Sequence, residues 1–362
     1  MKDTKSMENI LSYSKIIFYG IGNQFKECYK LFEQKDTVLF DSFLKKAGTV
    51  VNGKMIYPPS DLPKHYDSST AVVISSIYKQ HEIAKMLCSR WMIPSEHIYM
   101  YTSESWEKYI YRPELVEKNW DQILKCRDLL ADEASREYYM NSIQARMKRS
   151  PLMLHPNPNC RSTGEYGEAV TLKQGDLMID CGAYTGDTAA LYIDRLKGNC
   201  TVFAVEPFQL NYDAMLDRIR LNKWQKYVKP YNCALGEHES DSFIQYNDGD
   251  FGMAVNLSSE KGERRQPVKV ETLDHLFFGK KVSYIKMDIE GEECSALKGA
   301  VQLISANKPR LLISAYHRIE DLWRIPEIIW DINSSYKIFA GHAPDCSAEA
   351  EFYCIDKSEA DG

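Results

Sequence analysis

Short apolar runs alternate with amphipathic helical stretches along this chain, and the alternation predicts an α/β fold. The clearest run, residues 177–179, is followed by Asp180 and then by Gly182 and Gly186. The residues after this loop have the composition of a helix. A strand that ends in a small-residue loop before a helix is how doubly wound sheets make room for a nucleotide. The spacing D-x-G-A-x-x-G differs from the dinucleotide fingerprint, so the loop alone does not identify the ligand.

A second apolar run, residues 200–205, ends at Glu206 and Pro207. Glu206 lies 20 residues beyond Gly186. An acidic residue at this distance, at the end of the second strand, is placed to accept hydrogen bonds from both ribose hydroxyls of an adenosine. The alternative interpretation is a solvated glutamate at a strand end.

The same alternation continues to the C-terminus and predicts a mostly parallel sheet with helices on both faces. Further strands are predicted at 227–235, 242–246, 253–257, 267–270, 282–287, 310–315, 336–341 and 351–355. Helices are predicted at 188–196, 210–221, 293–306 and 325–332. Because the last two strands are joined by a short loop, we expect them to pair antiparallel.

The first hundred residues repeat this pattern on a smaller scale. Strands are predicted at 15–22, 37–40, 71–75 and 97–100, helices at 24–34 and 79–91, and a short hairpin at 50–57. The first strand ends in Gly20-x-Gly22, but Phe25 stands where the dinucleotide fingerprint has its third glycine. We interpret this part as a scaffold or dimerisation domain, with a nucleotide-sugar or carrier-binding module as the alternative.

Residues 104–150 carry apolar residues at helical spacing, which predicts two linking helices split near Asp132. The following loop, 150–168, contains three prolines. Loops so placed often close over a ligand, and Tyr166 is a candidate contact. Three parts are therefore predicted: a small Rossmann-like α/β domain at 1–103, a helical linker at 104–150 and a larger domain at 151–362.

Composition narrows the class of protein. The 362 residues are 44% hydrophobic and 27% charged, which is ordinary for a soluble globular protein. No apolar run approaches the roughly 18 residues of a membrane span. The charged N-terminus lacks an apolar signal core, so we expect a cytoplasmic protein. None of the ten cysteines forms a C-x-x-C pair, which favours scattered thiols over disulfides or a zinc site.

Charge is unevenly distributed between the two halves of the chain. Residues 1–150 have a balance of +3, and residues 151–362 have a balance of −9. The half with the glycine loop is therefore acidic, which disfavours nucleic acid as a partner. We expect a small-molecule or carbohydrate partner instead.

From residue 176 onward the chain resembles the FkbM family of S-adenosylmethionine-dependent methyltransferases. Five segments carry the resemblance in the family's order: DCGAYTGDT at 180–188, Glu206-Pro207, CALG at 233–236, VETLD at 270–274 and IKMDIEGEE at 285–293. The resemblance covers about residues 166–355. It implies a C-terminal class I methyltransferase Rossmann-like fold, with a seven-stranded, mostly parallel sheet whose last strand is antiparallel.

The resemblance also implies S-adenosylmethionine as the cofactor. Carried over residue by residue, it implies a cofactor site formed by Asp180, Gly182, Ala183, Gly186, Glu206, Pro207, Cys233, Ala234, Leu235 and Asp288. The first four would line the methionine part, Glu206 would hold the ribose hydroxyls, and residues 233–235 would flank the adenine.

Methyl transfer to a hydroxyl needs a positioned nucleophile and a group that takes its proton. The candidates are Lys286, Asp288, Glu290 and His317, at the ends of two predicted strands. His317 is the predicted general base, and two neighbouring carboxylates are expected to hold its pKa near neutrality. The alternatives are a structural histidine and an Asp288 that caps the next helix. The same acid–acid–histidine set could bind Mg²⁺ or Mn²⁺.

The sequence thus predicts an O-methyltransferase acting on a hydroxyl of a sugar or other small metabolite. Two alternatives stay open. One is a non-catalytic nucleotide- or nucleotide-sugar-binding protein with two Rossmann-like modules. The other is an oxidoreductase that uses the N-terminal Gly-x-Gly turn. The identity of the acceptor and the oligomeric state do not follow from the sequence.

Overall fold

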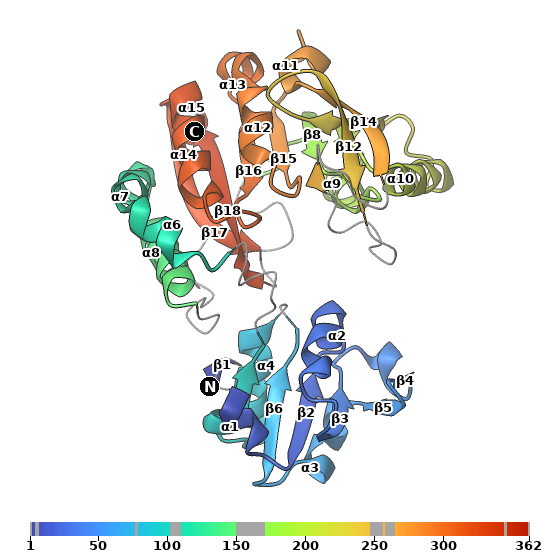
Figure 1. Ribbon diagram of the computed structural model, residues 1–362. Coiled ribbons are helices and arrows are strands. Elements are labelled where there is room, and N and C mark those ends of the chain that lie inside the picture. The colour runs from blue at the N-terminus through green and yellow to red at the C-terminus, as the bar shows by residue number, and fades with distance from the viewer. Residues whose placement is uncertain are drawn as a thin grey trace. The chain divides into compact units, whose positions relative to one another are not determined.

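The computed structural model describes residues 2–3, 7–76, 79–101, 110–149, 171–246, 256–257, 265–343 and 346–360. The chain divides into two compact units (Figure 1). The N-terminal unit comprises Met1–Glu114, Asn141–Pro156 and Asp345–Ala348, and the C-terminal unit comprises Leu115–Met140, Asn157–Pro344 and Glu349–Gly362. The predicted domain boundaries at 103 and 150, and the predicted contact Tyr166, lie outside the described residues and stay predictions.

The N-terminal unit contains a seven-stranded sheet in the order β1-β7-β6-β2-β3-β5-β4. Its strands are β1 (Lys2–Asp3), β2 (Lys15–Tyr19), β3 (Asp36–Phe40), β4 (Val50–Val51), β5 (Lys54–Tyr57), β6 (Thr70–Ile74) and β7 (Ile98–Met100). Its helices are α1 (Met7–Leu11), α2 (Asn23–Lys30), α3 (Leu62–His65) and α4 (Gln80–Arg90), with 3-10 turns η1 (Leu44–Lys46), η2 (Pro59–Asp61) and η3 (Ser95–His97). All strand pairs are parallel except β4 with β5.

The core of the N-terminal unit lies on both faces of this sheet, because successive side chains of a strand point to opposite sides. On β2, Ile16 and Phe18 belong to one apolar cluster, and Ile17 and Tyr19 belong to the other. Phe25 is buried in the first cluster, and its ring packs edge-on against Phe18 with 5.4 Å between the centroids. Core packing therefore accounts for an aromatic residue where the dinucleotide fingerprint has a glycine.

Along the chain, the described helices between the two sheets are α6 (Pro113–Lys118), α7 (Trp120–Leu129) and α8 (Glu133–Met147). The break between α7 and α8 falls at the predicted position near Asp132. Within the C-terminal unit, α7 packs against α14 (Asp321–Ile332). None of the described helices is long and apolar enough to cross a membrane.

The C-terminal unit is built on a second seven-stranded sheet, in the order β10-β9-β8-β15-β16-β18-β17. Its strands are β8 (Asp176–Cys181), β9 (Cys200–Val205), β10 (Val228–Tyr231), β15 (Tyr284–Met287), β16 (Arg310–Ser314), β17 (Tyr336–Ala343) and β18 (Cys346–Asp356). The pairs from β10 to β16 are parallel, whereas β18 runs antiparallel to β16. The parallel pairing brings the carboxyl ends of β8, β9, β15 and β16 to one edge of the sheet.

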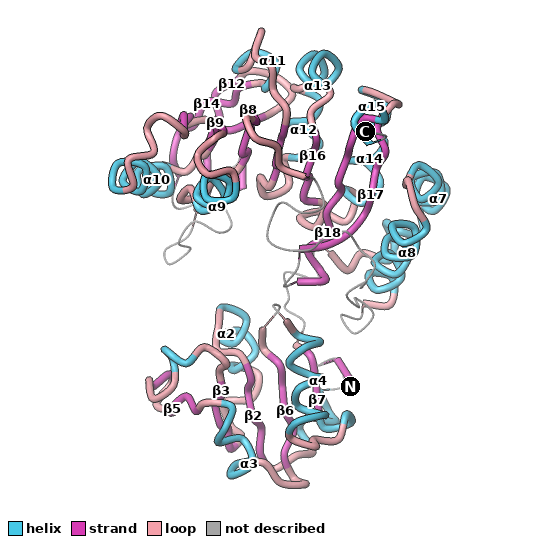
Figure 2. The backbone as a smooth tube through the Cα atoms, turned by 180° about the vertical axis from the view of Figure 1, so that it is seen from behind, coloured by secondary structure: helices cyan, strands magenta, loops and turns pink. Residues whose placement is uncertain are grey.

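The remaining helices of this unit are α9 (Asp187–Arg195), α10 (Gln209–Leu221), α11 (Leu273–Leu276), α12 (Glu293–Lys298), α13 (Val301–Asn307) and α15 (Lys357–Ala360). Figure 2 shows α9 and α10 in the view from behind. Their apolar residues, among them Tyr192 and Met215, share one buried cluster with Met178 and Val202 of the sheet. The strand that leads to the glycine loop is therefore anchored by a continuous core.

The C-terminal unit also contains a separate four-stranded sheet, in the order β11-β14-β12-β13. This sheet includes part of a segment that was predicted to be a single strand. Its strands are β11 (Ala234–Leu235), β12 (Ser240–Gln245), β13 (Asn256–Leu257) and β14 (Arg265–Glu271). The single strand predicted at 227–235 was wrong, because it divides into β10 of the main sheet and β11 of this one. Asn232 lies at the division, and its side chain donates hydrogen bonds to the carbonyls of Glu206 and Pro207 at 3.0 and 3.4 Å.

The single helix predicted at 293–306 was also wrong, because it divides into α12 and α13. Gly299 lies at the division, where an added Cβ atom would be 2.1 Å from the carbonyl oxygen of Gly236. Only a glycine permits this close approach. The predicted hairpin of 242–246 with 253–257 corresponds to the antiparallel pairing of β12 with β13, and residues 247–255 lie outside the described part of the chain.

Candidate active site

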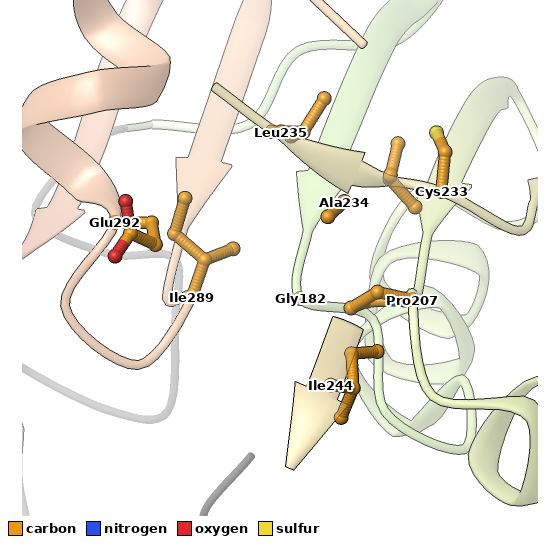
Figure 3. A pocket seen from close by; sticks show the side chains of 9 residues that line it. Gly182, Pro207, Cys233, Ala234, Leu235, Ile244, Ile289 and Glu292 are labelled. Atoms are coloured by element: carbon orange, nitrogen blue, oxygen red, sulfur yellow. The ribbon is translucent and has the colours of Figure 1, made fainter. Parts of the chain in front are cut away.

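A pocket lies beyond the carboxyl ends of β8 and β9 (Figure 3). It is lined by Gly182, Val205, Pro207, Cys233, Ala234, Leu235, Ile244, Ile289 and Glu292. In Figure 3, Ile289 and Glu292 lie on one side, opposite Pro207, Ala234 and Ile244. A narrow, mostly apolar pocket at the carboxyl edge of a parallel sheet suits a flat aromatic group such as a nucleobase.

The structure places the ten predicted cofactor residues in two groups. Half of them line the pocket: Gly182, Pro207, Cys233, Ala234 and Leu235. The other half lie outside the lining: Asp180, Ala183, Gly186, Glu206 and Asp288. Of these, Asp180 and Ala183 are fully buried, and Gly186 is the N-cap of α9. The lining residues that were not predicted are Val205 of β9, Ile244 of the small sheet, and Ile289 and Glu292 after β15.

Gly182 brings the first loop against the segment after β15. Its φ is +82°, and an added Cβ atom would lie 1.9 Å from the carbonyl oxygen of Asp288. No side chain fits in this space, so the glycine is required by the close approach of two backbones. The contact fixes the distance between the pocket and Asp288.

Glu206 is buried at the end of β9, between two residues that line the pocket. Its carboxylate accepts hydrogen bonds from the backbone N–H groups of Tyr184 at 2.9 Å and Phe208 at 3.0 Å, and from Asn211 Nδ2 at 3.3 Å. Burial raises the pKa of Glu206 to about 7, and these hydrogen bonds oppose the increase. Because each carboxylate oxygen has two lone pairs, Glu206 keeps acceptor capacity for a ligand.

Asp180 is fully buried, and neither of its carboxylate oxygens has a hydrogen-bond partner among the described residues. The nearest cation is Lys286, whose Nζ lies 3.4 Å from Oδ1. Burial raises the pKa of Asp180 to about 6. A buried carboxylate with unmet hydrogen-bonding capacity is a suitable acceptor for polar groups of a bound cofactor.

The structure brings the three predicted catalytic residues together. His317 Nε2 lies 3.6 Å from Asp288 Oδ1 and 3.6 Å from Glu290 Oε2. A fourth residue, Glu293, pairs with His317 Nδ1 at 3.0 Å and was missed by sequence reasoning. The only sequence signal for it was the third acid of the segment EGEE at 290–293, which follows the same strand. Asp288 does not cap α12, whose N-cap is Glu292.

The comparisons with known proteins agree with this geometry. A family model described as the methyltransferase FkbM domain matches residues 180–337. This part of the chain is an FkbM methyltransferase domain. The FkbM domain contains every residue predicted for the cofactor and for catalysis.

One solved structure shares its fold with most of this chain. Methyltransferase FkbM from Methylobacillus flagellatus KT matches with a TM-score of 0.65 and 20% identity, and covers 98% of this chain and 94% of that chain. Fibrillarin from Aeropyrum pernix, with bound S-adenosyl-L-methionine, has a TM-score of 0.34 and 13% identity, and covers 51% of this chain and 70% of that one. The second similarity is too low to support an argument. No curated protein matches this chain.

The pKa of His317 in the FkbM domain differs from the predicted value, because more acidic groups surround the ring than expected. Burial lowers the pKa of His317, but Glu293, Asp288 and Glu290 together raise it to about 10. The prediction of a pKa near neutrality was wrong, because Glu293 adds a third carboxylate. At neutral pH the ring is an imidazolium with both nitrogens protonated, so it cannot take a proton.

Glu290, unlike His317, has a pKa near neutrality. Burial raises its pKa to about 7, with Asp288, Glu293 and Glu206 adding to the increase and His317 opposing it. Its side chain keeps 39% exposure, so a substrate can reach it. A carboxylate that titrates near neutrality can accept a proton from an acceptor molecule.

The possible metal ligands differ from the predicted set, because Glu293 takes the place of Glu290. Ligand atoms of Asp288, Glu293 and His317 lie within 4.8 Å of one another. A histidine that binds a metal needs a ring nitrogen with a free lone pair. In the structure Asp288 and Glu293 instead pair with His317, and the comparisons do not support the predicted Mg²⁺.

The N-terminal unit has an acidic residue at the position equivalent to Glu206. Asp41 follows β3, and its carboxylate accepts hydrogen bonds from the N–H groups of Ile21 and Phe43, each at 2.8 Å. Lys46 Nζ pairs with the same carboxylate at 3.0 Å. Asp41 therefore serves to order its own loop, which favours the scaffold interpretation of this unit.

Proposed function

We propose that this chain is an S-adenosylmethionine-dependent O-methyltransferase that acts on a hydroxyl of a sugar or other small metabolite. The observation that carries the proposal is the position of Glu290. This carboxylate, with a pKa of about 7, follows the strand next to β8, and Ile289 and Glu292 beside it belong to the pocket. A pocket for the methyl donor thus adjoins a group suited to take the proton of a hydroxyl.

The residues present fit the proposed cofactor. Glu206 offers acceptor capacity for ribose hydroxyls, and Asp180 offers unmet acceptor capacity for a polar group beneath the pocket. The apolar residues around Ala234 and Ile244 suit adenine. When bound, S-adenosylmethionine would supply a methyl group on a positively charged sulfur.

The chain's own part in the reaction is to orient the acceptor and to move one proton. Glu290 would take the proton of the acceptor hydroxyl, and a bound S-adenosylmethionine would supply the methyl group that the oxygen receives. His317 holds Glu290 and Asp288 in place through its imidazolium charge. We therefore assign Glu290 as the general base and His317 and Asp288 as residues that position it.

The activity is tested with S-adenosylmethionine labelled in its methyl group, offered with nucleotide sugars and glycan fragments. We expect label in at least one hydroxyl-bearing acceptor. A chain that binds S-adenosylhomocysteine but transfers no label would favour the non-catalytic nucleotide-binding alternative. Binding of a nicotinamide nucleotide in place of S-adenosylhomocysteine would favour the oxidoreductase.

Replacing Glu206 by alanine should weaken the binding of S-adenosylhomocysteine by on the order of 2–4 kcal/mol, because two hydroxyl contacts to a charged acceptor are lost. Isothermal titration calorimetry measures the change. The matched control is Glu271→Ala, which removes a carboxylate of β14 that pairs with His275. Unchanged affinity in Glu206→Ala would show that Glu206 does not hold the ribose.

The N-terminal unit is proposed to scaffold the enzyme or dock the acceptor, and not to bind the methyl donor. We expect a chain truncated to begin near Ser103 to bind S-adenosylhomocysteine with an affinity within a few-fold of the full chain. The physical reason is that the pocket is lined by residues between 182 and 292. Circular dichroism reports whether the truncated chain is folded. A folded chain that does not bind would refute this assignment.

A further inference from the structure

A lysine is buried at the centre of the main sheet, behind the proposed active site. Lys286 has 3% exposure and lies on β15, in register with Asp180 of β8 and Leu312 of β16. Ammonium groups are rarely buried without partners, because they lose the hydration of a full charge. An apolar residue at this position would avoid the loss of hydration. The presence of a buried charge therefore needs an explanation other than packing.

The ammonium group of Lys286 connects the pocket to the acidic cluster. Nζ donates a hydrogen bond to the carbonyl oxygen of Gly182 at 3.1 Å. It lies 3.4 Å from Asp180 Oδ1 and 3.9 Å from Asp288 Oδ2. Gly182 lines the pocket, and Asp288 pairs with His317. The ammonium group of Lys286 thus contacts one residue that lines the pocket and one residue of the acidic cluster.

The glycine loop is held from a second direction as well. The carbonyl oxygen of Asp288 approaches Gly182 so closely that no Cβ atom fits between them. Lys286 holds the carbonyl oxygen of Gly182, while Asp288 limits the movement of its Cα atom. The distance between the loop and Asp288 therefore depends on a steric contact and an electrostatic one together.

We infer that Lys286 is a positioning residue of the proposed methyltransferase. Its ammonium group ties the glycine loop to Asp288 and keeps that carboxylate ionised for its ion pair with His317. The inference rests on the proposed function, because the loop and Asp288 matter only if the pocket holds the methyl donor.

The electrostatic surroundings support this role. The charge of Lys286 acts on acids from four segments: Asp180 on β8, Glu206 after β9, Asp288 after β15 and Glu351 on β18. Burial raises the pKa of Asp180, Glu206 and Glu351, and the charge of Lys286 opposes the increase. For Asp288 the effects of Lys286, His317 and Tyr316 outweigh burial, and its pKa is lowered. Loss of Lys286 should raise all four pKa values.

The first test needs no ligand: thermal unfolding of the full chain at several pH values. A carboxyl whose pKa is raised by folding binds its proton more tightly in the folded state, so stability falls as pH rises toward that pKa. In wild type the pKa values of Asp180 and Glu351 are about 6 and about 8. In Lys286→Met we expect the unfolding midpoint to fall more steeply than in wild type between about pH 6 and pH 9.

The control for this test is Lys308→Met, which removes a lysine that pairs with Asp356 away from the pocket. We expect its pH profile to run parallel to that of wild type. A purely structural role for Lys286 would lower the midpoint by the same amount at every pH. A Lys286→Met profile parallel to wild type would therefore overturn the inference.

The second test is the affinity for S-adenosylhomocysteine. We expect about 10- to 100-fold weaker binding in Lys286→Met, because a charge-assisted hydrogen bond to the loop is lost. Lys286→Gln can still donate to Gly182 and should bind more tightly than Lys286→Met. Equal affinity of both variants and wild type would contradict the link to the loop. If wild type itself does not bind, the proposed cofactor is wrong, while the pH profiles still report on Lys286.

Discussion

Replacing Glu290 by glutamine should lower the turnover number by roughly 10²–10⁴-fold and leave the affinity for S-adenosylhomocysteine nearly unchanged. Glutamine keeps the shape of the side chain but cannot take a proton. Glu290 does not line the pocket, so the binding of the methyl donor does not depend on it. Turnover is measured by label transfer, and affinity by calorimetry.

The pH dependence of turnover gives an independent readout of the same residue. The ionised form of Glu290 is the active one, and its pKa is about 7. Turnover in wild type should therefore rise with pH through about 7 and reach a plateau above it. Because His317 lowers the pKa of Glu290, His317→Ala should move this rise to higher pH. In Glu290→Gln the rise should disappear.

Glu292→Gln is the matched control for Glu290→Gln. Glu292 lines the pocket two residues away, and its carboxylate accepts a hydrogen bond from Arg318 Nη2 at 2.8 Å. Because Glu292 lines the pocket, we expect the donor to bind more weakly, but turnover at saturating donor should stay within a few-fold of wild type. Full turnover in Glu290→Gln, or an equal loss in both variants, would show that another group takes the proton.

Replacing Gly182 by alanine should destabilise the chain by roughly 2–5 kcal/mol. Part of this cost comes from a non-glycine residue at φ +82°, which disfavours any Cβ atom. The larger part comes from the overlap of the new methyl group with the carbonyl oxygen of Asp288, 1.9 Å away. To relieve the overlap the loop must move, so the affinity for S-adenosylhomocysteine should fall as well.

Gly175→Ala separates the two contributions. Gly175 has a similar φ of +86°, but an added Cβ atom would meet nothing within 4 Å. Its substitution should cost only the conformational part, about 1–2 kcal/mol. Denaturant unfolding of both variants gives the comparison. If the two glycines prove equally tolerant, the loop and the segment after β15 do not approach each other as described.

Local patterns in the sequence were enough to place the elements around the site. The apolar run at 177–179 became β8, and the run at 200–205 became β9 with Glu206 at its end. Each of these predictions depends on residues within one strand and the turn that follows it. The chemistry of a strand end and a glycine turn is local, so the sequence contains it.

Contacts between segments that are far apart in the sequence could not be predicted from such local patterns. The strand predicted at 227–235 has one apolar pattern, but only the pairing with β14 shows that its end leaves the main sheet. Likewise, nothing in the local pattern indicates that Glu293 turns back to His317, 24 residues later in the chain. Such contacts depend on how strands are ordered in the sheet.

By itself the sequence determined the α/β character, the glycine loop, the acid at the end of the second strand and the resemblance to the FkbM family. Only the tertiary structure decided which carboxylate is suited to take a proton. The pKa of His317 and that of Glu290 depend on burial and on three or more charged groups, some of which lie far away along the chain. Electrostatic interactions fall off with distance in space rather than along the chain, so the proposed roles of Glu290 as the base and of His317 as a cation depend on the fold.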